Sequence, residues 1–172
     1  SGGTLFSKCL SALPNVYLLS EVHPNTDLGV DMERPRYSPT DITSLARYAN
    51  IPLWNELADK IFKQSIITAH EHVESLGGIL LLRDHTHADF NTSNIIPDRS
   101  RVLTLLEEHF DTESVLTVRD PIDSYSSLVK NGWVHFEPKE FDEYCRRLLI
   151  LLKQFPKDRI FSYELFASDP QN

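Results

Sequence analysis

The chain begins with a short polar turn that contains two glycines and leads directly into an apolar segment, Ser1-Gly2-Gly3-Thr4-Leu5-Phe6-Ser7-Lys8-Cys9-Leu10. The apolar residues of this stretch, continued by Leu13, recur at the spacing of one helix face, and Pro14 ends the pattern because its ring clashes with the preceding turn. Free backbone amides and the helix dipole at such an N-terminus favour a negatively charged group. A small polar residue before a helix is usually only a cap, so an anion site needs support from a second feature.

Length and composition describe a single globular domain over residues 1–172. Of its 172 residues, 41% are hydrophobic and 24% are charged, which suits a folded domain with its own core. No apolar run is long enough to span a bilayer, and no signal-peptide pattern is present. The net charge of -8 disfavours broad nucleic-acid binding. The two cysteines, Cys9 and Cys145, indicate free thiols in a reducing compartment rather than a disulfide framework.

The two ends of the sequence look abrupt. The chain has no initiator methionine and starts inside a turn of a kind that normally follows a buried strand. We therefore expect an incomplete segment at both ends that lacks the first strand of its sheet.

Apolar runs and turn residues predict strands that alternate with helices. Short apolar runs predict strands at 16–19, 79–82, 114–118 and 159–163. Helical spacing and caps predict helices over about 5–13, 38–48, 52–76, 103–110 and 138–154, and a further helix that begins at Pro121, with loops at 25–37 and 88–100. This alternation predicts an α/β fold, a three-layer α/β/α sandwich with a central parallel sheet.

Ligands of such sheets bind outside the carboxyl ends of the strands. Those ends carry Glu21, then Arg83, Asp84 and His85, and then Arg119. The stretch from Arg119 to Ser127, with the sequence RDPIDSYSS, combines an arginine at the strand end with a helix capped by Asp120. The Arg119 guanidinium and the Ser127 hydroxyl can then converge on one phosphate. The alternative is a capped helix with an arginine on its rim.

The S-G-G-T loop and the later strand-R-D-P-x-D-x-x-x-S motif together resemble the sulfotransferases that use 3′-phosphoadenylyl sulfate (PAPS), with features of bacterial, tyrosylprotein and cytosolic members. The resemblance implies a P-loop NTPase-like fold and PAPS as the donor, with 3′,5′-ADP as its product. It implies that Ser1, Gly2, Gly3, Thr4 and Leu5 hold the 5′-phosphosulfate. By the same resemblance, Arg119 and Ser127 hold the 3′-phosphate, and Tyr163, in the Y-E-x-L…D-P segment, lies near the adenine.

Sulfuryl transfer to a hydroxyl or amine needs a base, positive charge around the transferring group, and in-line alignment, and the scheme requires no metal. Glu21 matches the catalytic glutamate of tyrosylprotein and related Golgi enzymes, and His85 matches the histidine base of cytosolic enzymes. Arg83 takes the place of the cytosolic lysine that contacts the donor. Glu21 and His85 remain alternatives for the base, because His85 has the more suitable pKa whereas Glu21 needs a strong positive field.

Two other functions are open to this sequence. A P-loop nucleotide kinase or NTPase is disfavoured because the loop lacks the G-K-[ST] ending and Lys8 falls inside the helix. A non-catalytic nucleotide-binding module would bind 3′,5′-ADP without transfer. A metal site at His85 and His87 is disfavoured because no third ligand has clear spacing.

The acceptor, a small molecule, glycan or peptide, is expected beside the loops at 22–37 and 131–136, where His23, Trp133 and Phe136 could contact a sugar or an aromatic group. No nucleic-acid partner and no membrane contact are expected within the segment. The bacterial-like motifs favour a cytoplasmic enzyme, with the Golgi lumen as the alternative if an anchor was removed. The sequence leaves the oligomeric state open.

Overall fold

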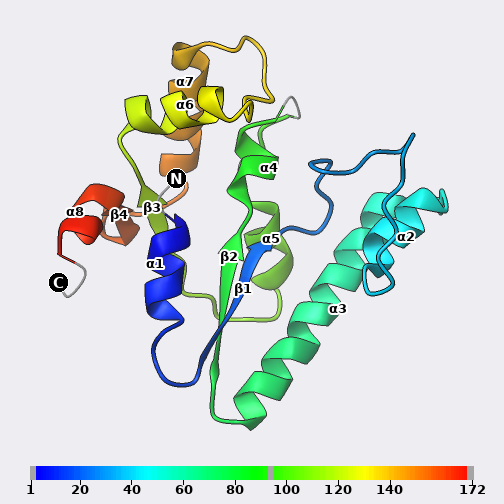
Figure 1. Ribbon diagram of the computed structural model, residues 1–172. Coiled ribbons are helices and arrows are strands. Elements are labelled where there is room, and N and C mark those ends of the chain that lie inside the picture. The colour runs from blue at the N-terminus through cyan, green and yellow to red at the C-terminus, as the bar shows by residue number, and fades with distance from the viewer. Residues whose placement is uncertain (1–2, 93–94, 170–172) are drawn as a thin grey trace.

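The computed structural model describes residues 3–92 and 95–169, so the predicted phosphosulfate residues Ser1 and Gly2 lie outside the described residues. The chain is a mixed α/β protein (Figure 1). Its strands are β1 (Val16–Val22), β2 (Ile79–Asp84), β3 (Leu116–Val118) and β4 (Ile160–Ser162). Its helices are α1 (Gly3–Leu10), α2 (Ile42–Tyr48), α3 (Trp54–Ser75), α4 (Thr86–Phe90), α5 (Arg101–Leu106), α6 (Pro121–Lys130), α7 (Phe141–Leu152) and α8 (Tyr163–Ser168), with a short 3-10 turn at Lys157–Arg159.

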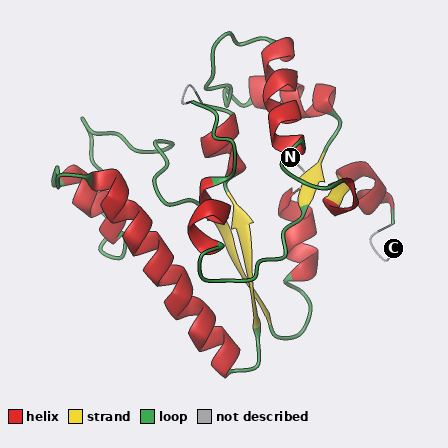
Figure 2. Ribbon diagram, turned by 180° about the vertical axis from the view of Figure 1, so that it is seen from behind, coloured by secondary structure: helices red, strands yellow, loops and turns green. Residues whose placement is uncertain are grey.

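The strands pair in parallel, as the alternation of strands and helices predicts. β1 pairs with β2 from Val16 opposite Ile79 onward, and β3 pairs with β4 from Leu116 opposite Ile160 onward. The described residues form two separate two-stranded sheets, visible as two groups of arrows in Figure 2. The expected alternating α/β chain with parallel strands is therefore confirmed, whereas a single central sheet is not formed by the described strands.

Helix α1 connects the two strand pairs. It packs against β1, β2 and β3, and it also contacts α8 (Figure 1). A cavity of about 560 Å³ separates β2 from β3, and it is lined by side chains of both strands, α1 and α5. Its walls are largely apolar and include Phe6, Leu80, Leu82, Leu106 and Leu116. The two pairs thus face one slot that α1 covers.

Each strand pair has its own hydrophobic core. Ile66, Val102 and Leu106 pack beneath β2, where the helices α3 and α5 meet it. Phe90 and Leu116 pack with Leu151 of α7 beside β3. These two cores fix the strand ends, which carry the chemically interesting side chains.

The sequence prediction of the apolar face of α1 is wrong in part. Ser7 is the buried residue of this helix, whereas Leu5 and Leu13 are 41% and 56% exposed. The Ser7 hydroxyl donates to the Gly3 carbonyl at 2.7 Å, which satisfies it inside the helix. The small side of the helix can therefore approach the strands closely, and the larger side chains are turned partly outward.

Several predicted helix boundaries are also wrong. α2 begins at Ile42 rather than at Ser38-Pro39, because the Asp41 carboxylate caps it by accepting from the Ser44 amide at 3.0 Å. α3 begins at Trp54, after Leu53 adopts a left-handed conformation with φ of 56°. Leu53 is 71% exposed and so does not belong to the buried face. The predicted loop at 88–100 contains the end of α4, and α5 begins at Arg101.

The helix after the second motif is capped as predicted, with one difference. The Asp120 side chain accepts from the amides of Ile122 and Asp123, and Pro121 occupies the first helical turn. The backbone amide of Asp120 donates to Glu164 Oε1 at 2.9 Å. A carboxylate from α8 therefore takes the position that a side chain in the first turn of α6 often fills in a capped helix.

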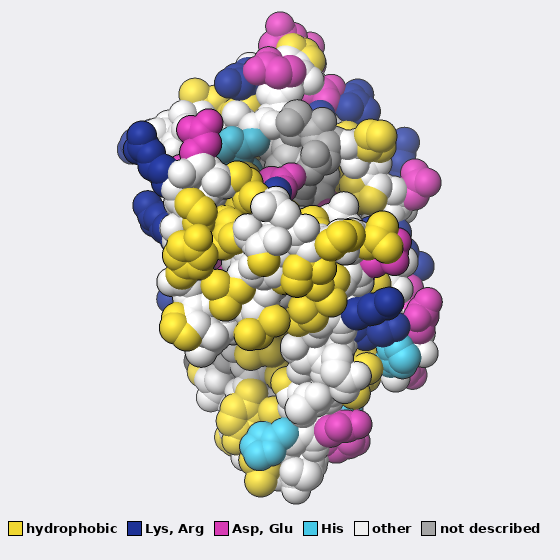
Figure 3. All heavy atoms as spheres, turned by 90° about the vertical axis from the view of Figure 1, so that its right-hand side faces the viewer, with side chains coloured by type: hydrophobic (Ala, Val, Ile, Leu, Met, Phe, Trp, Pro, Cys, Tyr) yellow, Lys and Arg dark blue, Asp and Glu magenta, His cyan; other side chains and the backbone are white. Residues whose placement is uncertain are grey.

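The outer face of α2 and α3 exposes several apolar side chains. Figure 3 shows hydrophobic side chains gathered across this face. Exposed apolar residues in and beside these helices include Tyr37, Ile42, Leu53 and Leu76. Among the described residues, no helix combines the length and the apolar character that crossing a membrane requires.

Arg147 of α7 is a buried cation that joins α7 to the end of α4 and to the residues just after it. Its side chain is 7% exposed, pairs with Glu143, and donates to the carbonyls of Phe90 (3.2 Å) and Thr92 (2.7 Å). Its guanidinium also lies 4.7 Å from the Phe136 ring centroid. Arg147→Leu should lower the free energy of unfolding by about 3 kcal/mol, measured by urea denaturation, because it leaves the buried carbonyls of Phe90 and Thr92 without this donor and removes one of the two arginines that pair with Glu143.

The matched control is Arg146→Leu, which removes the neighbouring arginine from the same glutamate. Arg146 is exposed and bonds only Glu143 in the described structure. We expect its replacement to leave the unfolding midpoint almost unchanged. If Arg147→Leu and Arg146→Leu lowered the free energy of unfolding equally, burial of Arg147 would not account for its contribution to stability.

Candidate active site

The carboxyl ends of β1 and β2 bring Glu21, Arg83 and His85 together. Ser20 lies opposite Arg83 and Val22 opposite Asp84, so Glu21 is an extra residue in a β-bulge. Its φ of 61° is left-handed, a conformation that costs a residue with a side chain on the order of 1–2 kcal/mol. A bulge re-aims the side chain that it carries, and such bulges are common beside active sites.

The Glu21 carboxylate joins two cationic or proton-bearing groups from β2. Its Oε1 accepts from Arg83 Nη2, and its Oε2 faces His85 Nδ1 in hydrogen-bonding contact. Arg83 Nη1 also donates to Ser20 Oγ at 3.1 Å. The two sequence candidates for the base are thus hydrogen-bonded to each other, which the sequence alone did not reveal.

This geometry determines the proton positions on His85. A carboxylate only accepts hydrogen bonds, so Nδ1 carries the proton and Nε2 of the neutral ring keeps its lone pair. His85 Nε2 is buried and has no hydrogen-bond partner among the described residues. The arrangement can therefore orient an imidazole whose free nitrogen accepts a proton from a bound group.

Burial shifts the pKa values of the residues around this cluster. It lowers the pKa of His85, with a smaller contribution from His23, and it lowers the pKa of Arg83. It also raises the pKa of Asp84 to about 6, although a hydrogen bond from Ser100, 2.5 Å from Asp84 Oδ2, opposes this. The pKa of His87 falls to about 4, chiefly through burial. His85 is therefore kept neutral and able to act as a base near neutral pH.

The N-terminus of α1 lies beside this cluster. A Cβ built on Gly3 would stand 3.6 Å from Arg83 Nε and 3.4 Å from Thr117 Oγ1, so the helix begins near the carboxyl ends of both β2 and β3. Thr4 and Leu5 belong to the first turn of α1 rather than to a loop, and both are exposed. Gly3, Thr4 and Leu5 therefore do not form the predicted polar turn, because the helix already begins at Gly3.

A second group of predicted residues meets at the ends of β3 and β4. Arg119 follows β3 and Tyr163 follows β4, and the parallel pairing places the guanidinium 5.7 Å from the tyrosine ring centroid. Arg119 Nη2 also lies 3.4 Å from Asp123 Oδ2. In α6, Ser127 receives hydrogen bonds from the Asn131 amide, at 2.7 Å to its carbonyl and 3.5 Å to its hydroxyl. No described contact joins Ser127 to Arg119.

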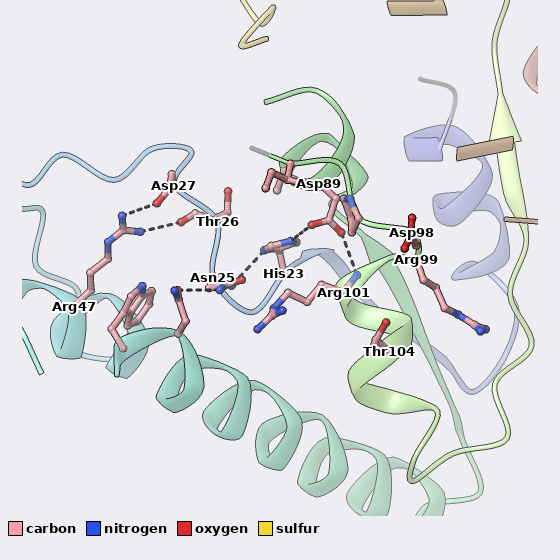
Figure 4. Close-up of a pocket in the computed structure, with 15 residues that line it drawn as sticks. His23, Asn25, Thr26, Asp27, Arg47, Asp89, Asp98, Arg99, Arg101 and Thr104 are labelled. Carbon is pink, nitrogen blue, oxygen red and sulfur yellow. Dashed lines mark hydrogen bonds and ion pairs between the residues drawn. The ribbon is translucent and has the colours of Figure 1, made fainter. Parts of the chain in front are cut away.

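A pocket near the first cluster contains His23, one of the predicted acceptor contacts, together with residues that sequence reasoning missed (Figure 4). Phe136, another predicted contact, is fully buried and so is not available to an acceptor. His23 Nε2 lies 3.1 Å from Asp89 Oδ1, and the other Asp89 oxygen accepts from the Arg101 amide. Arg47 and Trp54 line the far end of the pocket. These residues come from separate segments of the chain, so no local motif marks them. Among residues 3–92 and 95–169, no group of three or more His, Cys, Asp or Glu side chains is placed to hold a metal ion.

The raised pKa of Asp84 predicts a specific pH dependence of stability. Its ordinary value is 3.8 and its value in the fold is about 6, so the folded state binds the proton more tightly than the unfolded state. The contribution of Asp84 to stability is therefore lost as the pH rises through this window, by about 3 kcal/mol in all. Asp84→Asn does not titrate, so its free energy of unfolding relative to the native chain should rise by about that amount between pH 4 and pH 7.

Urea denaturation at each pH measures this difference. The lowered pKa of His87 has the opposite effect on stability, but it acts in both proteins and cancels in the comparison. A difference for Asp84→Asn that stays constant from pH 4 to pH 7 would contradict the burial argument.

Comparison with known proteins gives no match, whether to family models, to curated proteins or to solved structures. The chemistry of the site is therefore inferred from its own residues. The cluster of Glu21, Arg83 and His85 and the pair of Arg119 and Tyr163 are the two groups from which a function can be argued.

Proposed function

We propose that this domain transfers a sulfuryl group from PAPS to a hydroxyl or amine acceptor. The observation that carries the proposal is the Glu21–His85 contact, which leaves His85 Nε2 without a partner in the described part of the chain, near Arg83 and the start of α1. A base, a cation and a helix N-terminus are the parts that sulfuryl transfer requires, by the logic of phosphoryl transfer.

His85 is the base in this proposal, and Glu21 positions it. Both oxygens of the Glu21 carboxylate are occupied, one by Arg83 and one by His85, so Glu21 is poorly placed to take a proton from an acceptor. His85 Nε2 takes the acceptor proton while the acceptor oxygen or nitrogen forms a bond to sulfur and the bond from sulfur to the donor phosphate oxygen breaks. The Glu21 carboxylate then stabilises the imidazolium that forms.

Arg83 and the amides at the start of α1 supply the positive charge for the phosphosulfate end of the donor. Arg83 lies beside Gly3, and the helix N-terminus favours an anion. Arg119 supplies the charge for the 3′-phosphate, and Tyr163 supplies a ring for the adenine. The Arg119–Asp123 pair is long, at 3.4 Å, and Asp123 is 62% exposed, so a phosphate can replace that carboxylate at little cost.

The proposal also includes a more specific fold, a three-layer sandwich similar to that of P-loop NTPases. The slot between β2 and β3 is flanked by two parallel strand pairs, is largely apolar, and is covered by α1 on one side. One further parallel strand in this slot would join the two pairs into one continuous sheet. That strand would end beside Gly3, where the anion-binding turn is expected.

Nucleotide titration tests the donor site. The chain should bind 3′,5′-ADP at least about tenfold more tightly than 5′-AMP in isothermal titration calorimetry, because Arg119 forms charge-assisted hydrogen bonds with the 3′-phosphate. Arg119→Ala should abolish this preference, and Ser127→Ala should weaken it by a smaller factor.

Arg159→Ala is the matched control for the titration. Arg159 lies before β4, at the opposite end of that strand from Tyr163, and makes an exposed ion pair with Glu113 at 2.5 Å. Its replacement should leave both affinities unchanged. Equal affinity for the two nucleotides in the native chain would remove the basis for a 3′-phosphate site.

Substitution of the proposed base tests the chemistry separately from binding. His85→Asn should reduce turnover by at least about 100-fold, while the affinity for 3′,5′-ADP stays within a few-fold of the native value. Glu21→Gln should reduce turnover less, because the imidazole remains in place but loses the carboxylate that orients it. Transfer of labelled sulfate from PAPS to an acceptor is the measurement.

His87→Asn is the control, since it removes a second half-buried histidine whose ring centroid lies 6.1 Å from that of His85. We expect it to retain turnover. Full turnover in His85→Asn, or a loss confined to Glu21→Gln, would make Glu21 the base. Nucleotide binding without transfer in the native chain would instead indicate a binding module.

A further inference from the structure

A pocket of about 720 Å³ lies between the loop after β1, the start of α3 and the segment that leads into α5 (Figure 4). We call it the loop pocket. It adjoins the cluster of Glu21, Arg83 and His85, because His23 lines the pocket and follows Glu21 by two residues. The charge of His23 also acts on Asp84 and His85. We propose that the loop pocket binds the acceptor and that the group it binds is an uncharged sugar. The role as acceptor rests on the proposed function, whereas the sugar binding does not.

The floor of the loop pocket is a fixed polar network. His23 Nδ1 accepts from the Asn25 amide at 3.2 Å, so the proton lies on Nε2 and is donated to Asp89. The other Asp89 oxygen accepts from the Arg101 amide at 3.1 Å. The side chains of His23 and Asp89 are only 5% and 10% exposed. Since these buried groups satisfy one another, the floor does not need an ion to complete it.

The charges that line the loop pocket are balanced. They come from Arg47, Arg99, Arg101, Asp27, Asp89 and Asp98. Each arginine already has a carboxylate partner: Arg47 has Asp27 at 2.5 Å, Arg101 has Asp59, and Arg99 has Glu107. An anionic ligand would have to break one of these pairs. The lining therefore favours an uncharged ligand.

The remaining hydrogen-bonding groups match hydroxyl groups. The Asn25 side chain donates to Asn55 Oδ1 at 3.1 Å, which leaves the Asn55 NH₂ group as a donor without a partner among the described residues. Asp27 and Asp98 provide carboxylate acceptors. A sugar hydroxyl both donates and accepts, so neighbouring hydroxyls can use an amide and a carboxylate together.

Trp54 gives the loop pocket an aromatic wall. It is half-buried, and the Arg47 guanidinium lies 5.4 Å from its ring centroid, which holds the indole in place. Its N–H can donate to a ligand, and its ring can pack on the apolar C–H face of a sugar. The other apolar lining residues, Ala88, Ile95 and Pro97, offer too little surface for an apolar aromatic acceptor, which needs a mostly hydrophobic pocket.

Direct binding of neutral disaccharides tests the inference without sulfuryl transfer. Maltose, lactose, cellobiose and trehalose are titrated separately, at millimolar concentrations, into the full chain and followed by tryptophan fluorescence and calorimetry. We expect at least one to bind. Trp54→Leu should weaken that binding about tenfold, and Asn55→Ala should weaken it by a smaller factor.

The second tryptophan of the chain provides the matched control. Trp133 is 55% exposed, follows α6, and does not line the loop pocket. In Trp133→Phe, where Trp54 is the remaining reporter, emission should change on addition of sugar. In Trp54→Phe, where Trp133 remains, it should not. A response from Trp133 alone would place the ligand elsewhere and overturn the proposal.

Two further probes define the ligand class. Glucose 6-phosphate tests for a charged ligand, and 4-nitrophenol tests for an apolar aromatic one. Tighter binding of either than of every disaccharide, or no binding of any disaccharide, would overturn the assignment of a neutral sugar. Sugar binding without 3′,5′-ADP binding would leave the loop pocket assigned and remove the sulfotransferase proposal. Binding of 3′,5′-ADP without binding of any sugar would remove only the assignment of the loop pocket as a sugar site.

Discussion

The carboxylate of Glu21, shared between Arg83 and His85, is the interaction on which the geometry of the candidate site depends. It exists because β1 carries one extra residue at its end, held in a left-handed conformation that a regular strand would not adopt. The same carboxylate holds Arg83 beside the start of α1 and sets the tautomer of His85. From His85 the chain passes into α4, which carries Asp89 and so reaches the floor of the loop pocket. One bulge therefore links the proposed donor, base and acceptor positions.

Features that depend on neighbouring residues were predictable from the sequence. Continuous apolar runs identified β1 and β2, and the Asp120-Pro121 cap identified the start of α6, because both signals lie within a few residues. The same reasoning failed where two local signals compete. Ser38-Pro39 and Asp41 each resemble a helix start, and only the hydrogen bond from the Ser44 amide to Asp41 selects the second. On α1, close packing against the strands buried the small residue Ser7 rather than the largest apolar side chains.

Features that depend on distant residues were not predictable. Glu21 and His85 were alternatives at the level of sequence because nothing local reports that residues 64 positions apart form one hydrogen bond. The contact gives the two residues different proposed roles: Glu21 orients His85, and His85 takes the acceptor proton. Asp89 and Arg147 gave no sequence signal either, because each is buried through partners on other elements. The two strand pairs, with an apolar slot between them, likewise emerge only in three dimensions.

The partners of the arginines distinguish the two ligand regions in a chain of net charge -8. Against that background, an anionic donor must be held by cations that are not already committed. Arg119 has a long contact with an exposed carboxylate, and its guanidinium lies over the Tyr163 ring, so it can turn to a phosphate. In the loop pocket, Arg47 holds Asp27 and the Thr26 carbonyl, and Arg101 makes two bonds to Asp59. A phosphate gains little there, because each of its contacts would replace an existing ion pair. This difference supports a charged nucleotide at the ends of β3 and β4 and an uncharged acceptor beside β1.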